Sequence, residues 1–346
     1  MILPLLLEDV VWYGPATVTF YVQFPGDPFD GAKNDVCVRF IGDRSQREER
    51  PAYFDPILGA WKATLYAKQD GSYRAVLVRN GKDALVEASE GIVDLRRDDT
   101  AGILLAPPTR NDRLTMVNGR PWVGLGVDLG SSATAEKIDA LADAGATWVR
   151  IVPPEDLWSD ASMGSFSEAV DEIERRGLGY TLVVPKGASA AWQRYAAARF
   201  GASPRLVSWE GQKGLPDPWT RPVVPAALGW DGLFDNRPGP FVVEGSDLAR
   251  IKALRAVLQS SGWAEWQSPR IWQGSGAKGV GESDRLILMA SPGATLTGIP
   301  LADGTYNLTT VDPKTGASTV GQTRVDHAAL NLEAPRESFF VLRRKL

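Results

Sequence analysis

Cysteine and histidine are almost missing from this chain of 346 residues, which contains one of each, Cys37 and His327. A single cysteine cannot form a disulfide within the chain, and a single histidine cannot build a His-rich metal site. The two counts argue against zinc fingers, Cys–His proteases and hydrolases that depend on a histidine. We therefore expect no metal and no cofactor, and we expect carboxylates to carry most of any chemistry. Cys37 lies within a predicted strand, where we expect a small buried hydrophobe, and we expect His327 to be structural.

An excess of positive charge and a long apolar run are also missing. The net charge of −4 gives no electrostatic basis for binding nucleic acid or an anionic membrane surface. No apolar run approaches the roughly 20 residues that span a bilayer, so we expect no integral membrane segment. Residues 1–7 are apolar but short, and they predict either a first strand or the end of a signal peptide.

Enough apolar material is present for ordinary cores, since 44% of the residues are hydrophobic. The length favours two or three domains. In the first part of the chain, β-branched and aromatic residues gather in short runs separated by turn residues, at 18–22, 36–40, 60–65 and 72–78. This spacing predicts an antiparallel β-sandwich, which we assign to residues 1–100.

The middle of the chain alternates between strand and helix patterns. Strands are predicted at 122–127, 147–152, 180–184, 205–209 and 241–243. Between them we expect a helix around 138–142, one starting from a capping box at Ser165 and Glu168, and one at 192–200. A last helix is predicted to start at Ser246 and to end at Gly262, with a buried stripe formed by Leu248, Ile251, Leu254 and Leu258. This order predicts a parallel α/β domain over 110–274.

The β pattern returns near the end of the chain. Strands are predicted at 286–289, 305–310 and 338–342, and a hairpin turn is predicted at 312–316. We assign residues 282–346 to a small β-sandwich. The predicted fold class is therefore multidomain, with β-sandwiches on both sides of an α/β domain.

Glycines 124, 126 and 130 follow one strand and precede a helix, as in phosphate-binding loops. Their spacing departs from the dinucleotide fingerprint, and no second motif of an actin-like ATPase follows. A tight strand-to-helix turn accounts for them better.

Carboxylates stand at the ends of the predicted parallel strands: Asp128, Glu155, Glu210 and Glu244. A barrel or an open α/β sheet would bring such residues together at one rim. Two carboxylates about 5 Å apart serve retaining glycoside hydrolysis, and a wider gap serves inversion. Glu210 and Glu244 are the pair to test, because each follows a predicted strand and precedes a glycine. Alternatively, these carboxylates serve as caps and as partners of Arg or Lys.

Tryptophan is abundant, with 12 residues. Exposed indole rings can stack on sugars, and Trp158, Trp219 and Trp230 are the candidates for substrate binding. Other tryptophans fall within predicted strands and are expected in the core. Arg150, in an otherwise apolar strand, is expected either to bind a carboxylate at the rim or to form a buried ion pair.

Three parts of the chain resemble bacterial glycoside-hydrolase-like proteins. In the first domain the resemblance lies in residues 27–30, 36–40, 53–55, 61–62 and 70–74, and in the middle it lies in 117–126 and 141–151. Near the end it lies in 248–263, 286–288 and 312–316. The resemblance implies an N-terminal β-sandwich of unknown function, a (β/α) barrel, and a C-terminal β-sandwich often labelled collagen-binding. It also implies an extracytoplasmic protein, periplasmic or secreted.

The resemblance further implies a saccharide or polysaccharide as ligand, with Glu210 as acid/base and Glu244 as nucleophile. Asp128, Arg150 and Glu155 would position the substrate. Family members carry Asn–Glu at the acid/base, whereas this chain has Trp209–Glu210. The alternative is therefore a non-catalytic carbohydrate-binding or envelope-assembly scaffold, a pseudoenzyme that meets protein partners through its β-sandwiches.

The length of the chain supports the non-catalytic alternative. The two sandwiches take roughly 100 and 70 residues and leave about 160–170 for the middle, whereas an eight-fold barrel takes ~250. We therefore expect a shortened barrel, with units missing between residues 215 and 240.

Overall fold

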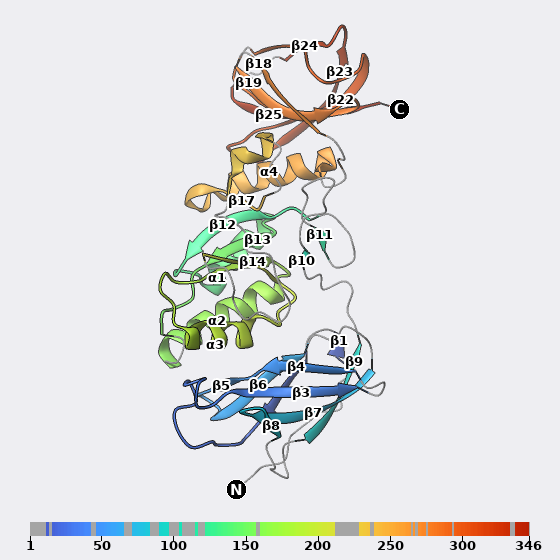
Figure 1. The fold of residues 1–346 in the computed structure, drawn as a ribbon. Coiled ribbons are helices and arrows are strands. Elements are labelled where there is room, and N and C mark those ends of the chain that lie inside the picture. The colour runs from blue at the N-terminus through green and yellow to red at the C-terminus, as the bar shows by residue number, and fades with distance from the viewer. Residues whose placement is uncertain are drawn as a thin grey trace. The chain divides into compact units, whose positions relative to one another are not determined.

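The computed structural model describes residues 12–13, 16–42, 46–65, 71–83, 90–96, 104–105, 115–116, 122–156, 160–211, 228–235, 239–263, 266, 269–274, 276–292, 294–332 and 336–345. Figure 1 shows the fold as a ribbon. The apolar start at residues 1–7 lies outside the described residues. Among the helices that are described, none combines the length and the apolar character needed to cross a membrane.

The chain divides into two compact units, each made of three separate segments. The first comprises Met1–Leu105, Ile151–Asp171 and Tyr180–Pro225, and the second comprises Ala106–Arg150, Glu172–Gly179 and Ala226–Leu346. The assignment of domains to 1–100, 110–274 and 282–346 stays a prediction.

Two β-sheets at the start of the first unit enclose one apolar core. Their strand orders are β1-β9-β7-β3-β4, with β8 on β7, and β2-β6-β5, and all pairs are antiparallel except β1–β9. Val36, Val38 and Phe40 alternate along β3 with no exposed surface, and Trp61 and Tyr73 join them from other strands. This alternation confirms the predicted sandwich-like antiparallel sheets. The strands are β1 (Trp12–Tyr13), β2 (Ala16–Phe20), β3 (Val36–Gly42), β4 (Arg47–Pro51), β5 (Tyr53–Asp55), β6 (Ala60–Leu65), β7 (Gly71–Arg79), β8 (Lys82–Asp83) and β9 (Glu90–Arg96).

Parallel strands follow in both units. In the first unit, β14 (Gly179–Val183) and β15 (Leu206–Glu210) pair in parallel. In the second unit, β12 (Leu125–Gly130) pairs in parallel with β17 (Phe241–Val242), which also pairs in parallel with β16 (Leu228–Gly229). The predicted α/β pattern is therefore confirmed as parallel pairing, while the shortened barrel stays a prediction. The remaining strands of this stretch are β10 (Leu104–Leu105), β11 (Thr115–Met116) and β13 (Trp148–Ile151).

The helices between these strands begin at polar caps. Thr134 accepts a hydrogen bond from the Lys137 amide at the start of α1, and Ser189 does the same for Trp192 in α3. The predicted capping box at Ser165 is wrong, because α2 already begins at Asp160 and Ser165 lies within it. The helices are α1 (Ala135–Asp143), α2 (Asp160–Arg175), α3 (Ala190–Phe200) and α4 (Leu248–Ser261), with 3-10 turns η1 (Trp230–Asp235) and η2 (Glu244–Ser246).

Helix α4 begins at Leu248 rather than at the predicted Ser246, and Asp247 caps it by accepting a hydrogen bond from the Arg250 amide. Ile251 and Leu254 are buried as expected, whereas Leu248 is 37% exposed and does not belong to the predicted buried stripe. Leu248 is the first residue of the helix, and at this end of the helix its side chain lies partly outside the core.

The second unit ends in an antiparallel sheet of order β18-β19-β20-β25-β22-β23, with a small sheet, β21-β24. Leu288, Leu296, Tyr306 and Phe340 are among the residues that fill its core. The sheets confirm the predicted β character of the C-terminal part. The strands are β18 (Arg270–Gly274), β19 (Ala277–Glu282), β20 (Arg285–Ala290), β21 (Thr295–Thr297), β22 (Gly304–Val311), β23 (Ser318–Val325), β24 (Ala329–Asn331) and β25 (Ser338–Arg344).

Candidate functional site

The ends of β12 and β13 bring two of the predicted site residues together. Arg150 Nη1 lies 2.6 Å from Asp128 Oδ2. The other carboxylate oxygen, Oδ1, accepts a hydrogen bond from the Gly130 amide at 2.9 Å. The Arg150 side chain is 18% exposed and that of Asp128 is 42% exposed, so the pair reaches solvent through its carboxylate. Arg150 thus binds a carboxylate of the chain itself.

Glycine at position 126 allows β12 to pass close to its neighbour. A Cβ at Gly126 would lie 1.6 Å from the carbonyl oxygen of Trp148, so any other residue would force the backbones apart. Strand β17 pairs on β12 with Val242 opposite Gly126. Asp128 lies two positions after Gly126, within β12, and Glu244 lies two positions after Val242, beyond the end of β17. Glu244 is exposed and begins η2.

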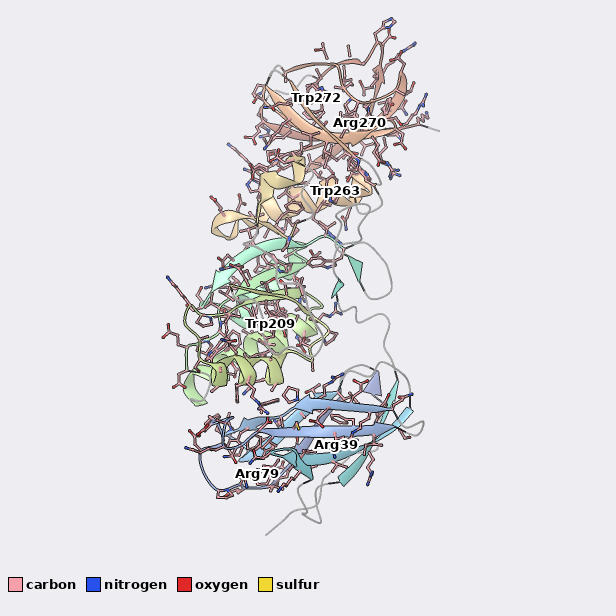
Figure 2. The ribbon with its side chains drawn as sticks, viewed as in Figure 1. Arg39, Arg79, Trp209, Trp263, Arg270 and Trp272 are labelled. Atoms are coloured by element: carbon pink, nitrogen blue, oxygen red, sulfur yellow. The ribbon has the colours of Figure 1, made fainter. Side chains whose placement is uncertain are left out.

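Glu210 lies in the first unit, as the last residue of β15 rather than one position beyond the strand. Its carbonyl accepts a hydrogen bond from the Val184 amide at 2.8 Å, and the residue is half-buried. The preceding Trp209 (Figure 2) is 1% exposed and belongs to the core. Glu155, also in the first unit, is exposed beyond β13. The pairing of Glu210 with Glu244 stays a prediction.

Trp230 is the only one of the three tryptophan candidates that falls within the described residues, because Trp158 and Trp219 lie outside them. Its half-buried ring packs against Phe234 and Phe339, with centroid distances of 6.3 Å and 5.8 Å. The Arg250 guanidinium lies over the ring, 4.7 Å from its centroid. Trp230 therefore has a packing role, and its predicted contact with a ligand stays a prediction.

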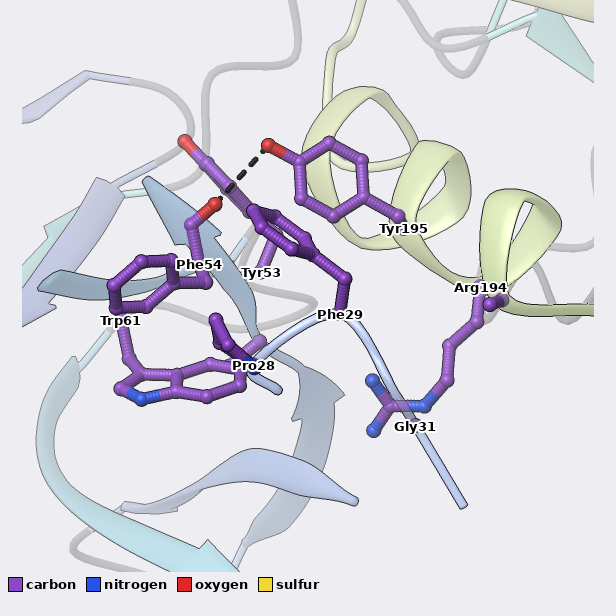
Figure 3. Close-up of a pocket in the computed structure, with 10 residues that line it drawn as sticks. Pro28, Phe29, Gly31, Tyr53, Phe54, Trp61, Arg194 and Tyr195 are labelled. Atoms are coloured by element: carbon purple, nitrogen blue, oxygen red, sulfur yellow. Dashed lines mark hydrogen bonds between the residues drawn. The ribbon is translucent and has the colours of Figure 1, made fainter. Parts of the chain in front are cut away.

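A small aromatic cavity in the first unit, which the sequence did not indicate as a site, lies where α3 packs on β5 (Figure 3). Tyr195 donates a hydrogen bond to the Phe54 carbonyl at 3.1 Å, and its ring lies 5.9 Å from that of Phe29. Burial raises the pKa of Tyr53, which also lines this cavity, to about 12. The free volume is only ≈ 10 Å³, room for about one water molecule. Parts of the family-like stretches at 27–30 and 53–55 thus pack against α3.

One group of side chains in the described part of the chain could offer ligands to a metal ion. The ligand atoms of Asp303, Asp326 and His327 lie within 4.8 Å of one another, and all three residues are exposed. The group is open to water on the surface of the C-terminal β-sheets. Without a buried ligand or a second indication of an ion, we assign it no function.

Comparison with known proteins gives no match to a protein-family model and none to the sequence of a curated protein. A solved structure matches along the whole chain. It is described as a "putative glycoside hydrolase" from Bacteroides vulgatus ATCC 8482, and it aligns with 97% of this chain and 99% of its own, at a TM-score of 0.62 and 10% identity. The two chains share a fold. At this identity the likeness extends to the fold alone.

Two further glycoside hydrolases match with lower scores. A pullulanase from Anoxybacillus sp. LM18-11 aligns with 98% of this chain and 86% of its own, with a TM-score of 0.40 and 9% identity. A family 30 subfamily 8 xylanase from Clostridium acetobutylicum aligns with 64% of this chain and 96% of its own, with a TM-score of 0.36 and 10% identity. With scores below 0.5, these two matches add nothing to the assignment of the fold. The predicted resemblance is thus confirmed only in its coarse form, as a glycoside-hydrolase-like fold.

Proposed function

We propose that this chain is a glycoside-hydrolase-like protein that binds or cleaves a saccharide at the carboxyl ends of its parallel strands. The observation that carries this proposal is the fold shared with the Bacteroides protein over 97% of the chain. The proposal includes a shortened (β/α) barrel in the middle of the chain and a bacterial, extracytoplasmic protein. Function in such folds resides in the site rather than in the architecture, so the residues at the strand ends must carry the chemistry.

The strand-end residues supply the groups that such a site needs. Asp128 presents a partly exposed carboxylate, held by Arg150, to orient sugar hydroxyls. In the catalytic version, Glu210 protonates the glycosidic oxygen while Glu244 attacks the anomeric carbon to form a glycosyl–enzyme. Water then attacks the anomeric carbon, Glu210 takes its proton, and Glu244 leaves as the free carboxylate.

A substrate screen with two variants tests this function. The full chain is assayed against aryl glycosides and against plant and bacterial polysaccharides, scoring binding and cleavage separately. Glu210→Gln and Glu244→Gln should each lower the turnover by about 10²–10⁴-fold, because each removes a group that transfers a proton or forms the covalent bond. Glu136→Gln, on the exposed first turn of α1, is the matched control. Cleavage that survives both strand-end substitutions would refute the catalytic pair.

One observation favours the non-catalytic alternative. The position where the resembled family carries Asn, just before the acid/base, holds Trp209, whose side chain is buried in the core. A buried indole cannot orient a substrate, so the chain would bind saccharide without cleaving it, as a pseudoenzyme or an assembly scaffold. Saccharide binding without release of reducing sugar, in the wild type as in both Gln variants, would decide for this alternative.

A further inference from the structure

A groove of ≈ 410 Å³ opens on the C-terminal sheet of the second unit, and no residue of the parallel strands lines it. Its size falls within the range of small-molecule sites. The residues that shape it include Gln273, Lys278, Met289, Ser291 and Glu337. None of them belongs to the strand-end site described above.

Side chains from three paired strands form the floor of this groove. Gln273 on β18 lies opposite Lys278 on β19, and Lys278 lies opposite Met289 on β20. Directly paired residues project to the same face of a sheet, so the three side chains form one row. Trp272, one position earlier on β18 (Figure 2), is instead packed in the core with Leu288. The row therefore lies on the face opposite that core.

The charges at the groove are already balanced by partners from other elements. Lys278 Nζ lies 3.5 Å from Asp231 Oδ2 in η1, and Glu337 Oε1 lies 3.8 Å from Arg250 Nη1 in α4. Two cations and two anions leave no net charge. A ligand with a net charge would have to compete with these ion pairs, whereas a neutral ligand would not. The groove thus favours a neutral occupant.

The lining combines hydrogen-bonding groups with a small apolar surface. The Gln273 amide and the Ser291 hydroxyl can each donate and accept, Lys278 donates, and the 51%-exposed Glu337 carboxylate accepts. Met289 adds an apolar contact, and Gly276, at the hairpin between β18 and β19, leaves the backbone open to close approach. Such a lining matches a ligand with several hydroxyls around a ring whose faces are C–H groups.

We propose that this groove is a second saccharide-binding site, which holds a neutral sugar through its hydroxyls. It would hold a saccharide on the protein whether or not the strand-end site cleaves it. The proposal is thus separate from the proposed function, and the two can fail independently.

Calorimetric titration of the full chain tests the groove, with xylohexaose, maltohexaose and cellohexaose as probes. The Glu244→Gln background prevents cleavage during the titration. Combining Gln273→Ala with Glu337→Gln in that background should weaken the binding of at least one probe about tenfold, since it removes the Gln273 amide and the negative charge of the Glu337 acceptor. Gln322→Ala is the matched control, because Gln322 is an exposed glutamine on β23, at the opposite edge of the same sheet. It should leave binding unchanged.

Ser291→Ala provides a second variant that removes a single hydroxyl. It is used if the combined variant does not have the same unfolding temperature as the wild type. It should weaken binding severalfold. If none of the three hexasaccharides binds, or if both groove variants bind as tightly as their parent, the groove proposal is wrong. Binding of free lysine or glutamate in place of the sugars would also overturn it. If the wild type cleaves a saccharide but the groove variants bind the probes as tightly as their parent, the groove proposal is wrong and the proposed function still holds.

Discussion

The Arg150 guanidinium donates a hydrogen bond to Asp128 Oδ2 across 2.6 Å, joining the ends of two neighbouring elements of the second unit. Because the Gly130 amide holds the other oxygen at 2.9 Å, the carboxylate is fixed by both of its oxygens. The 42% exposure of Asp128 leaves its remaining lone pairs open to solvent. A carboxylate held in one orientation and open to water can receive hydroxyl groups of a ligand without first being ordered.

Asp128→Asn tests whether this carboxylate serves a ligand or only the fold. The side chain is more than one-third exposed, so solvent screens its ion pair, and the free energy of unfolding should change by less than about 1 kcal/mol. The affinity for a saccharide that binds at the strand ends should fall by about tenfold or more, because the charged acceptor is lost. Asp139→Asn is the control, since Asp139 is similarly exposed (45%) and also pairs with an arginine, Arg175. Equal losses of affinity in the two variants would show that Asp128 has no special role.

Two glycine substitutions should change stability in opposite directions. Gly126→Ala places a methyl group 1.6 Å from the Trp148 carbonyl oxygen, and the strands must separate. We expect the free energy of unfolding to fall by about 3 kcal/mol or more. Gly164→Ala meets open space within α2 and should raise stability by about 0.5–1 kcal/mol, since alanine is the better helix former. Urea titration of both variants gives the comparison, and destabilisation by Gly164→Ala would contradict it.

Asp55 should contribute to stability at neutral pH and lose that contribution in acid. Burial acts to raise the pKa of this carboxyl, but hydrogen bonds from the Lys62 ammonium at 2.7 Å and the Leu58 amide outweigh it and hold the pKa below the ordinary 3.8. Because the pKa is lower in the folded state, the stabilisation is complete above pH 3.8 and disappears as the pH falls through the folded value. Asp55→Asn should therefore lower the free energy of unfolding at pH 7 by about 1–3 kcal/mol.

The same pair of proteins, compared by urea unfolding at several pH values, provides the decisive measurement. The difference between wild type and Asp55→Asn should shrink as the pH falls below about 4. Asp235→Asn, at the exposed end of η1, serves as control and should show a difference near zero at every pH. A constant difference for Asp55→Asn across the whole range would rule out the ionised carboxyl as its source.

Cys37 should react slowly with thiol reagents. The sequence predicted a buried apolar residue, but the thiol is half-buried and donates a hydrogen bond to Glu49 Oε1 at 3.2 Å. Burial and this contact raise the pKa of Cys37 to about 12, so almost no thiolate forms at pH 8. We expect labelling of the folded protein by a disulfide reagent to be about a hundredfold slower than that of the urea-unfolded chain.

Glu49→Gln separates the two causes of this slow labelling. The substitution removes the negative charge beside the thiol, so the pKa of Cys37 should fall and the labelling rate at pH 8 should rise. Glu282→Gln, far along the chain in β19, should leave the rate unchanged. If the folded wild type reacts as fast as the unfolded chain, the raised pKa is wrong.

Local patterns in the sequence were sufficient for most of the secondary structure. Strand β3 follows from alternation at Val36, Val38 and Phe40, since period-two burial needs only a sheet with one covered face. Helix α4 ends as predicted at Gly262, which adopts the left-handed conformation that glycine tolerates. Its start was misplaced by two residues, because Ser246 and Asp247 are both acceptable caps and the chain uses the aspartate.

Spacing along the chain was enough to predict the order of the β, α/β and β parts and to find carboxylates near the strand ends. Tertiary structure alone decided which side chains meet. Arg150 could have bound a carboxylate of a ligand or one of the chain, and only the folded structure shows its ion pair with Asp128. The groove of Gln273, Lys278 and Met289 was likewise invisible, because a cross-strand row joins residues that no local period relates.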